Sequence, residues 1–337
     1  MKLAESLVDS GLVPEGLLRA GIRAVCAMRL RQERGTVEEE QARHQRFVTE
    51  LRGSDIAIET AAANAQHYEV PAEFFTRVLG SHLKYSSGYW PSGVTTLDAA
   101  EAAMLELTAA RAQLGPDQDV LDLGCGWGSL SLWAAARYPT SRFIAVSNSR
   151  TQRAFIEDRA AARGLTNLVV RTADVRALEL PAASFDRVVS IEMFEHMRNY
   201  QALLRGIARW LRPGGALFVH VFAHRRFAYP FEDAGGSDWM AREFFTGGLM
   251  PSAQLLHAFQ DDLQIVDEQH LSGMHYARTA EAWYENTVTN RDEIVRVLGD
   301  RRKYERWRVF FLACAELFGF GGGGEWIVAH YRWARRP

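Results

Sequence analysis

The amino-acid sequence predicts an α/β protein built on a mostly parallel β-sheet. Between residues 115 and 225, short apolar runs rich in β-branched residues alternate with segments of helical length. This alternation is typical of βαβ units, whose sheets are covered by helices on both faces. A chain of 337 residues, 47 % of them hydrophobic and 24 % charged, is long enough to bury such a sheet.

The chain begins with two segments of helical character. Residues 16–34 place apolar side chains at helical spacing, and residues 36–54 continue with mixed charge. We therefore expect residues 1–60 to form an N-terminal helical extension. An aromatic loop, KYSSGYWPSG (84–93), then precedes a helix at 95–114 that opens with a capping Thr and an early acid.

The predicted core, residues 115–225, contains five strands separated by helices. The strands are expected at 119–124, 142–149, 167–174, 185–195 and 216–223, and the helices at 129–139, 150–165 and 200–215. In open parallel sheets, ligands bind outside the carboxyl ends of the strands. The sequence therefore predicts a binding site at that edge.

The remaining third of the chain contains a long loop and the last strands. Residues 226–262 are aromatic and too long for a plain connection, so we expect a cap or lid insertion there. Residues 263–337 are expected to hold the final strands and helices. The strands are predicted at 262–273 and 325–336, the helices at 279–299 and 303–318, and a flexible glycine turn at 319–325.

Composition excludes several classes of protein. The net charge is −2, without a basic patch, so we expect no nucleic-acid partner. Neither a signal peptide nor a run of about 18 apolar residues is present in the sequence, so no integral membrane association is expected. Three widely spaced cysteines, Cys26, Cys125 and Cys314, suggest reduced thiols in a cytoplasmic protein, not a disulfide framework or a metal site.

The segment VLDLGCGWGSL (120–130) reads as a strand, a G-x-G-x-G loop and a helix. Glycines permit a tight turn and let the backbone approach a ligand closely. The spacing differs from the G-x-G-x-x-G of dinucleotide sites, which leaves a nucleoside-like cofactor or a plain turn. Asp122, two residues before Gly124, is placed to structure this loop or to meet a cation.

The ends of the next two strands carry polar side chains. The second strand ends without the acid that often binds ribose, but Asn148 and Gln152 are neutral partners for its hydroxyls. Alternatively, Asn148 caps the following helix. Asp174, at the end of the third strand, either accepts from an adenine amine or caps the next helix.

The octet SIEMFEHM (190–197) places Glu192, Glu195 and His196 at the end of the fourth strand. A carboxylate there favours a cationic substrate, and a neighbouring imidazole can take its proton. The alternative is packing, with His196 satisfied in a helix start and Glu195 acting as a cap or buried pair.

Several of these motifs resemble known enzymes. VLDLGCGWG (120–128), the acid after the third strand and LRPGGALFV (211–219) resemble a class I S-adenosylmethionine-dependent methyltransferase. More narrowly, LKYSSGYW (83–90), SIEMFEHM and FFTGGLMPS (244–252) look like the family of cyclopropane-fatty-acid synthases and coclaurine N-methyltransferases, closer to the latter type. This similarity extends from about residue 65 to 335. It implies a mostly parallel, seven-stranded Rossmann-like sheet with N-terminal helices and a helical or loop cap, and a methyltransferase domain at 61–337.

The resemblance also implies roles for individual residues. S-adenosylmethionine would be the methyl donor, contacted by Tyr85, Ser86, Gly124, Gly126, Asn148, Gln152, Asp174 and Val175, without a metal. In the cyclopropane synthases a bicarbonate ion acts as base, beside residues that correspond to Glu195, His220 and a cysteine. Ser87 stands in place of that cysteine, a departure from bicarbonate chemistry. In the coclaurine-type enzymes the Glu and His of FEH are held to be catalytic, and both are present as Glu195 and His196.

We therefore expect N-methylation of a hydrophobic, benzylisoquinoline-like amine. Glu195 would bind the amine, His196 would take its proton, and Glu192 would either contact the amine or form a salt bridge elsewhere. His220 would be structural or a wall of the pocket. The alternative is C-methylation of unsaturated acyl lipids, and a third hypothesis is a cofactor-binding protein without activity. The expected partner is a small-molecule amine, and a homodimer is compatible with the sequence.

Aromatic residues of the two C-terminal regions are candidates for the walls of the site. A few of them are expected to line it, and the others to pack in the core. The candidates are Phe227, Tyr229, Phe231, Trp239, Phe244, Phe245, Trp307, Phe310, Phe311 and Phe318.

Overall fold

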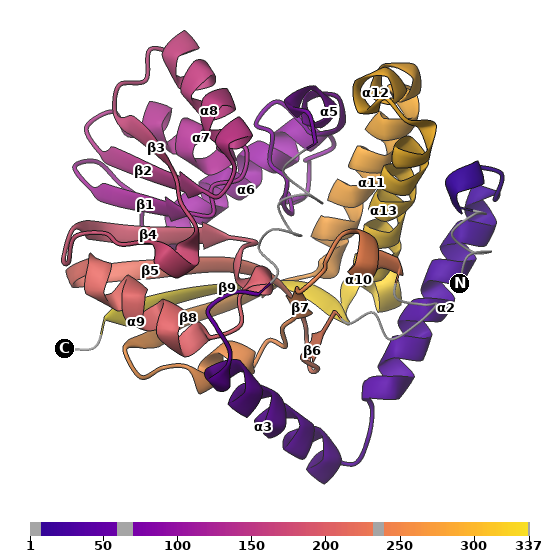
Figure 1. Cartoon of the computed structure of the whole chain (residues 1–337), viewed down its shortest axis with the longest axis horizontal. Helices are drawn as coiled ribbons and strands as arrows, with labels where there is room; N and C mark the ends of the chain where they lie inside the picture. The colour runs from indigo at the N-terminus through magenta and orange to yellow at the C-terminus, as the bar shows by residue number, and fades with distance from the viewer. Residues whose placement is uncertain (1–7, 59–69, 232–238, 336–337) are drawn as a thin grey trace.

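The computed structural model describes residues 8–58, 70–231 and 239–335. Within this part of the chain, seven strands form one sheet in the order β3-β2-β1-β4-β5-β9-β8 (Figure 1). They are β1 (Asp119–Leu123), β2 (Arg142–Ser147), β3 (Leu168–Thr172), β4 (Phe185–Ile191), β5 (Leu211–His224), β8 (Leu263–Leu271) and β9 (Trp326–Arg335). The first five pair in parallel, and β9 runs antiparallel to β5 and β8. The prediction of a mostly parallel, seven-stranded α/β sheet is confirmed.

Neighbouring residues along the strands face opposite sides of the sheet, and each side packs against its own helices. Leu121, Val188 and Leu217 belong to a core cluster with residues of α3 (Val37–Gly53) and α9 (Tyr200–Trp210). Val120 and Val189 belong to a second cluster, with residues of α6 (Leu97–Ala112) and α7 (Ser129–Arg137). A sheet covered on both faces explains why the strand sequences are almost uniformly apolar.

Two predicted boundaries in the core were wrong. The strand expected at 185–195 ends at Ile191, because Glu192 has a φ of 47° and cannot continue a strand. A short 3₁₀ helix, η2 (Phe194–His196), follows it. The helix expected at 200–215 ends at Trp210, and β5 begins at once because Pro213 cannot donate within a helix.

A group of helices lies beside the carboxyl ends of the parallel strands (Figure 1). They are α5 (Ala72–Val78), α11 (Gly273–Thr289), α12 (Arg291–Leu298) and α13 (Arg301–Gly319). The single helix predicted at 279–299 is in fact α11 and α12, separated at Asn290. Its start was also missed. A Cβ at Gly273 would lie 2.0 Å from the carbonyl oxygen of Trp326, so only glycine lets α11 begin this close to β9.

Both predicted N-terminal helices are present, but they lie in different places. The helix α3 packs near α9, whereas α2 (Glu15–Glu33) runs along α13 (Figure 1). Arg19 ties α2 to the C-terminal helices through ion pairs with Glu281 at 2.5 Å and Glu316 at 2.9 Å. The division of the chain at residues 60 and 61 stays a prediction.

The predicted cap segment, 226–262, contains short elements. They are β6 (Tyr229–Pro230), α10 (Trp239–Glu243), β7 (Leu249–Met250) and η3 (Leu255–Ala258), and β6 pairs with β7. Residues 232–238 of this segment lie outside the described part of the chain, and its function as a lid stays a prediction. None of the helices described is long and apolar enough to cross a bilayer.

Candidate active site

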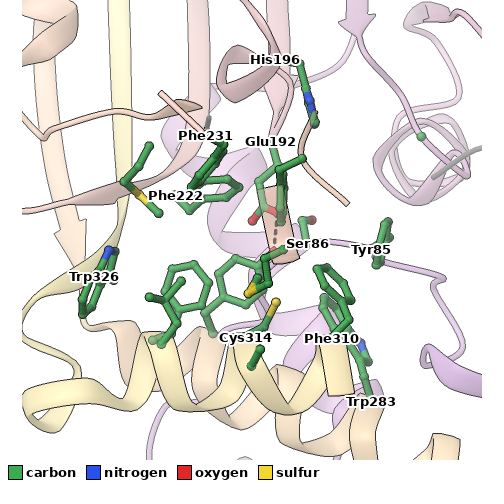
Figure 2. A pocket seen from close by; sticks show the side chains of 18 of the residues that line it. Tyr85, Ser86, Glu192, His196, Phe222, Phe231, Trp283, Phe310, Cys314 and Trp326 are labelled. Carbon is green, nitrogen blue, oxygen red and sulfur yellow. Dashed lines mark hydrogen bonds between the residues drawn. The ribbon is translucent and has the colours of Figure 1, made fainter. Parts of the chain in front are cut away.

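A cavity of about 520 Å³ lies at the carboxyl ends of β1 and β4, between the sheet and helices α2, α11 and α13. A second cavity, of about 80 Å³, adjoins it and shares Gly124, Gly126, Gln152, Glu192 and His196 with it. The predicted edge of the sheet therefore carries a pocket with two compartments. Figure 2 shows the larger one, with the Glu192 carboxylate pointing toward the helix that carries Phe310 and Cys314.

The glycine loop forms one wall of both compartments. Gly124 has a φ of 86°, and a Cβ there would lie 2.8 Å from the Cβ of Met193, so the turn requires glycine. A Cβ at Gly126 would meet nothing within 4 Å, so the loop is open toward the cavity. Asp122 accepts a hydrogen bond from Ser131 at 2.5 Å, and burial raises its pKa to about 6. Asp122 thus structures the loop, which is the first of the two roles expected for it.

The residues predicted for a ribose lie where β2 ends. The Gln152 side chain accepts from the Ser147 hydroxyl at 2.6 Å, while its buried Nε2 has no partner within the described part of the chain. Asn148 lines the smaller cavity. The alternative that Asn148 caps the next helix is wrong, because the Ser149 hydroxyl accepts from the Gln152 backbone N–H. Gln152 lines both cavities, and an amide can donate to a hydroxyl-bearing ligand.

Asp174 and Val175 also line the smaller cavity. The Asp174 carboxylate accepts from the backbone N–H of Arg176 at 2.9 Å and pairs with its guanidinium at 2.6 Å. The capping alternative for Asp174 is therefore correct, and the same residue still borders the compartment that Asn148 lines.

Tyr85 and Ser86 line the larger cavity beside a residue that the sequence reasoning missed. Lys84 is 1 % exposed, and its ammonium donates to the Ser86 hydroxyl at 2.5 Å. Burial lowers its pKa to about 8, although the charges of Glu192 and Glu101 oppose that shift. The position of this lysine within the aromatic loop 84–93 could have identified it as a site residue from the sequence.

Glu192 is the carboxylate that lines both compartments. Its Oε1 accepts from the Ser87 backbone N–H at 3.0 Å and from His220 Nε2 at 3.1 Å, and its Oε2 accepts from the Tyr276 hydroxyl at 2.7 Å. Burial raises its pKa, while the charge of Lys84 and the hydrogen bonds from Tyr276 and Ser87 oppose the rise. The outcome is a fixed carboxylate at the cavity wall.

Glu195 is placed differently, and its position does not support a direct contact with the amine. It is fully buried and lines neither cavity. Its Oε1 accepts from the Phe222 backbone N–H of β5 at 2.8 Å, because the turn after Glu192 carries it beneath that strand. Burial, together with the charge of Glu192, raises its pKa well above the ordinary value.

His196 lines both compartments, and its ring stacks on Phe245. Burial lowers its pKa to about 4, so the imidazole is neutral near pH 7. His220 is fully buried and lines neither cavity, so its structural alternative is correct. The structure thus brings Glu192 and His196 to the cavity and leaves Glu195 and His220 behind its wall.

Aromatic side chains make most of the remaining wall. Of the ten candidates, the larger cavity is lined by Tyr229, Phe231, Trp239, Phe245, Phe310 and Phe318. The other four pack in the core clusters. Apolar residues of α2 complete the wall, and these were not predicted: Leu17, Leu18, Ile22, Val25 and Cys26.

The residues present fit a nucleoside-type cofactor. Gln152, whose buried amide nitrogen has no partner among the described residues, lines both cavities together with Gly126. Asn148 and Asp174 line the smaller one, so these four residues border one connected site. Among the residues described, no group of three or more His, Cys, Asp or Glu is arranged to hold a metal ion. The sheet order with its antiparallel β9, together with the glycine loop after β1, defines a class I methyltransferase fold.

Comparisons with known proteins narrow this class. The sequence profile of the mycolic acid cyclopropane synthetase family matches residues 57–322. The (S)-coclaurine N-methyltransferase of Thalictrum flavum subsp. glaucum is 39 % identical over 335 residues, covering 96 % of this chain and 92 % of the plant protein. The cyclopropane-fatty-acyl-phospholipid synthase of Escherichia coli (strain K12) is 29 % identical over 256 residues, covering 75 % of this chain and 63 % of that one.

A solved structure agrees with this similarity. The crystal structure of coclaurine N-methyltransferase bound to N-methylheliamine and SAH superposes with a TM-score of 0.94 at 38 % identity, covering 98 % of this chain and 99 % of that one. The chain belongs to the mycolic acid cyclopropane synthetase family and is more similar to these coclaurine N-methyltransferases than to the bacterial synthase.

Proposed function

We propose that this protein transfers a methyl group from S-adenosylmethionine to the nitrogen of a hydrophobic, benzylisoquinoline-like amine. The observation that carries the proposal is the Glu192 carboxylate, which faces an aromatic-walled cavity and is held by three donors. A fixed anion in an apolar pocket favours an organic cation. The plant relatives, which act on coclaurine by name, support this choice of acceptor.

Each part of the cavity has a task in this reaction. When bound, S-adenosylmethionine supplies an electrophilic methyl group on a sulfonium. Glu192 binds and orients the ammonium form of the acceptor, and a ring nitrogen of His196 at the cavity wall takes its proton. Burial weakens His196 as a base, and the charge of Glu192 opposes that effect. The aromatic walls exclude water and hold the ring system of the acceptor, so positioning supplies much of the rate. Glu195 acts indirectly by tying η2 to β5.

The cofactor would be held by Tyr85, Ser86, Gly124, Gly126 and Gln152, together with the smaller cavity, which Asn148, Asp174 and Val175 line. This assignment rests on the position of each residue at the cavity wall. A cytoplasmic location and a homodimer stay sequence-based predictions.

The lipid alternative is less well supported by the contacts. Ser87 and His220, which the resemblance places beside a bicarbonate ion, both donate to Glu192 instead. A side-chain carboxylate thus uses the donors that a bicarbonate ion would need. If cells that express the protein accumulate cyclopropane or methyl-branched acyl chains, the lipid hypothesis replaces ours.

The test is an acceptor screen with purified protein that measures S-adenosylhomocysteine release across benzylisoquinolines, simpler amines and unsaturated lipids. Glu192→Gln should raise the KM for the amine by about tenfold or more, as expected for the loss of a hydrogen bond to a charged group. Its affinity for S-adenosylhomocysteine should stay near that of the unmodified protein. An unchanged KM would refute the proposed role of Glu192.

A further inference from the structure

Three side chains from three elements, and Glu192 in the turn after β4, form one series of buried contacts behind the cavity. Arg111 Nη1 on α6 lies 2.6 Å from His330 Nδ1 on β9, and His330 Nε2 lies 2.9 Å from His220 Nδ1 on β5. His220 Nε2 then reaches Glu192 Oε1 at 3.1 Å. The two histidines stand directly opposite each other in the antiparallel β5–β9 pair, so their rings share one face of the sheet.

The chemistry of arginine gives this chain a direction. A guanidinium only donates hydrogen bonds, so His330 must accept at Nδ1 and carry its hydrogen on Nε2. That hydrogen makes His220 an acceptor at Nδ1, which leaves its own hydrogen on Nε2, facing Glu192. One obligate donor near the protein surface therefore determines the tautomers of both rings.

Both rings are held neutral, so each has one hydrogen to place. His220 is fully buried and His330 is 2 % exposed, and burial lowers the pKa of both well below the ordinary value. The positive charges of Arg111 and Lys84 lower them further. An additional proton on Nδ1 of either ring would face the hydrogen of the nitrogen that donates to it. The other titratable groups near Glu192 are Tyr276, His196, Glu195 and Cys314. Asp267 and Tyr89 are the titratable groups near Arg111.

We propose that Arg111 and His330 are positioning residues for the amine-binding carboxylate. They fix the tautomer of His220, which must then donate to Glu192 Oε1. The Glu192 carboxylate is consequently held in one orientation, as the acceptor of that hydrogen bond. Arg111, which lies three contacts away, determines this orientation. The consequence for turnover rests on the proposed function, whereas the tautomer assignment does not.

The same direction excludes one role for the chain. Every hydrogen in it points toward Glu192, so a proton arriving on Glu192 finds no free nitrogen on His220. The proton released by the amine therefore leaves on the cavity side, where His196 lies. These contacts orient Glu192 and do not carry protons away from it.

The first experiment measures the tautomers directly. In ¹⁵N-labelled protein, long-range ¹H–¹⁵N spectra distinguish the two neutral forms, and His220→Gln and His330→Gln identify the two resonances among the ten histidines. We expect both rings to be protonated at Nε2. Arg111→Met should give a mixture of tautomers at both rings, and Arg111→Lys, which keeps an obligate donor, should preserve the original form. Arg137→Met, at an exposed position on α7, is the matched control.

The second experiment measures turnover in the same variants. Arg111→Met should raise the KM for the amine by about tenfold, with the affinity for S-adenosylhomocysteine unchanged, and Arg111→Lys should restore most of it. A wild-type His220 protonated at Nδ1, or spectra of Arg111→Met that match the wild type, would overturn the proposal. A wild-type ring protonated at Nδ1 refutes the proposal even if Arg111→Met does not fold. If no amine is methylated, the proposed function fails while the tautomer assignment can still be confirmed or refuted.

Discussion

The backbone of a single residue explains why only one carboxylate of SIEMFEHM faces the cavity. Glu192 has a φ of 47°, a left-handed conformation that costs a non-glycine residue about 1–2 kcal/mol. This turn ends β4, directs the Glu192 side chain into the pocket and carries Glu195 beneath β5. The donors that surround the Glu192 carboxylate hold it in this conformation. Backbone strain is thus located at the residue proposed to bind the amine.

The hydroxyl of Tyr276 should control the pH at which Glu192 becomes charged. Burial raises the pKa of Glu192, and the hydrogen bond from Tyr276 lowers it. Tyr276→Phe removes the lowering contribution, so the pKa of Glu192 should rise further. The acid limb of the pH profile of kcat/KM should then move to higher pH, with little change on the basic side. An acid limb that stays in place would show that Glu192 does not titrate in it.

Glu195 should act through its contact with β5. Glu195→Ala leaves the Phe222 N–H without its acceptor and removes the tie between η2 and β5, so turnover should be lost while cofactor affinity stays near normal. Glu195→Gln keeps an oxygen in the same place and should recover most of the turnover. Measuring kcat and KM for both variants separates the two roles. If Glu195→Gln is as inactive as Glu195→Ala, the carboxyl group itself takes part in the reaction.

At the scale of elements, α2 is the helix whose position the sequence did not predict. Its apolar residues line the cavity, and Arg19 fastens it to α11 and α13. Arg19→Met should loosen this wall and raise the KM for the amine by about fivefold, because partly exposed ion pairs contribute about 1 kcal/mol. High salt should produce a similar change in the unmodified protein. Arg31→Met, on the exposed face of the same helix, should leave the KM unchanged.

Element positions were predictable where local pattern decides them. The strands and helices of the core follow from apolar periodicity, and Thr96 caps α6 as the sequence indicated. The errors occur where a distant contact decides. The start of α11 depends on the approach of Gly273 to Trp326, and the end of β4 depends on the anchoring of Glu192 by Ser87 and Tyr276. A sequence window does not contain these contacts.

At the scale of the whole molecule, the cofactor compartment joins the sheet to the helices beside it. S-adenosylhomocysteine at one hundred times its Kd should stabilise the fold by about 2.7 kcal/mol and raise the Tm by several degrees. Gln152→Ala removes an amide from both compartments and should reduce this shift. Glu192→Gln should leave it intact. Thermal unfolding with and without the ligand checks both expectations, and an equal shift in all three proteins would contradict the placement of Gln152.

The candidate site was predictable only in its locally encoded parts. The residues of the glycine loop, Asn148, Gln152 and Asp174 all lie at the cavity wall, because each follows a parallel strand. The choice between Glu192 and Glu195 was not encoded in the octet. Likewise, Arg111 and His330 lie far from Glu192 in the sequence, so only the folded chain shows that they act on it.

The placement of α2 has a consequence for how such enzymes diversify. The match to the family profile begins at residue 57, after α2, so one wall of the pocket lies outside the part of the chain that the profile matches. Exchanging the first 34 residues between relatives would alter which acceptor fits without touching the residues proposed to handle its proton. The N-terminal helix is therefore a natural point for engineering new acceptor preferences into an unchanged catalytic scaffold.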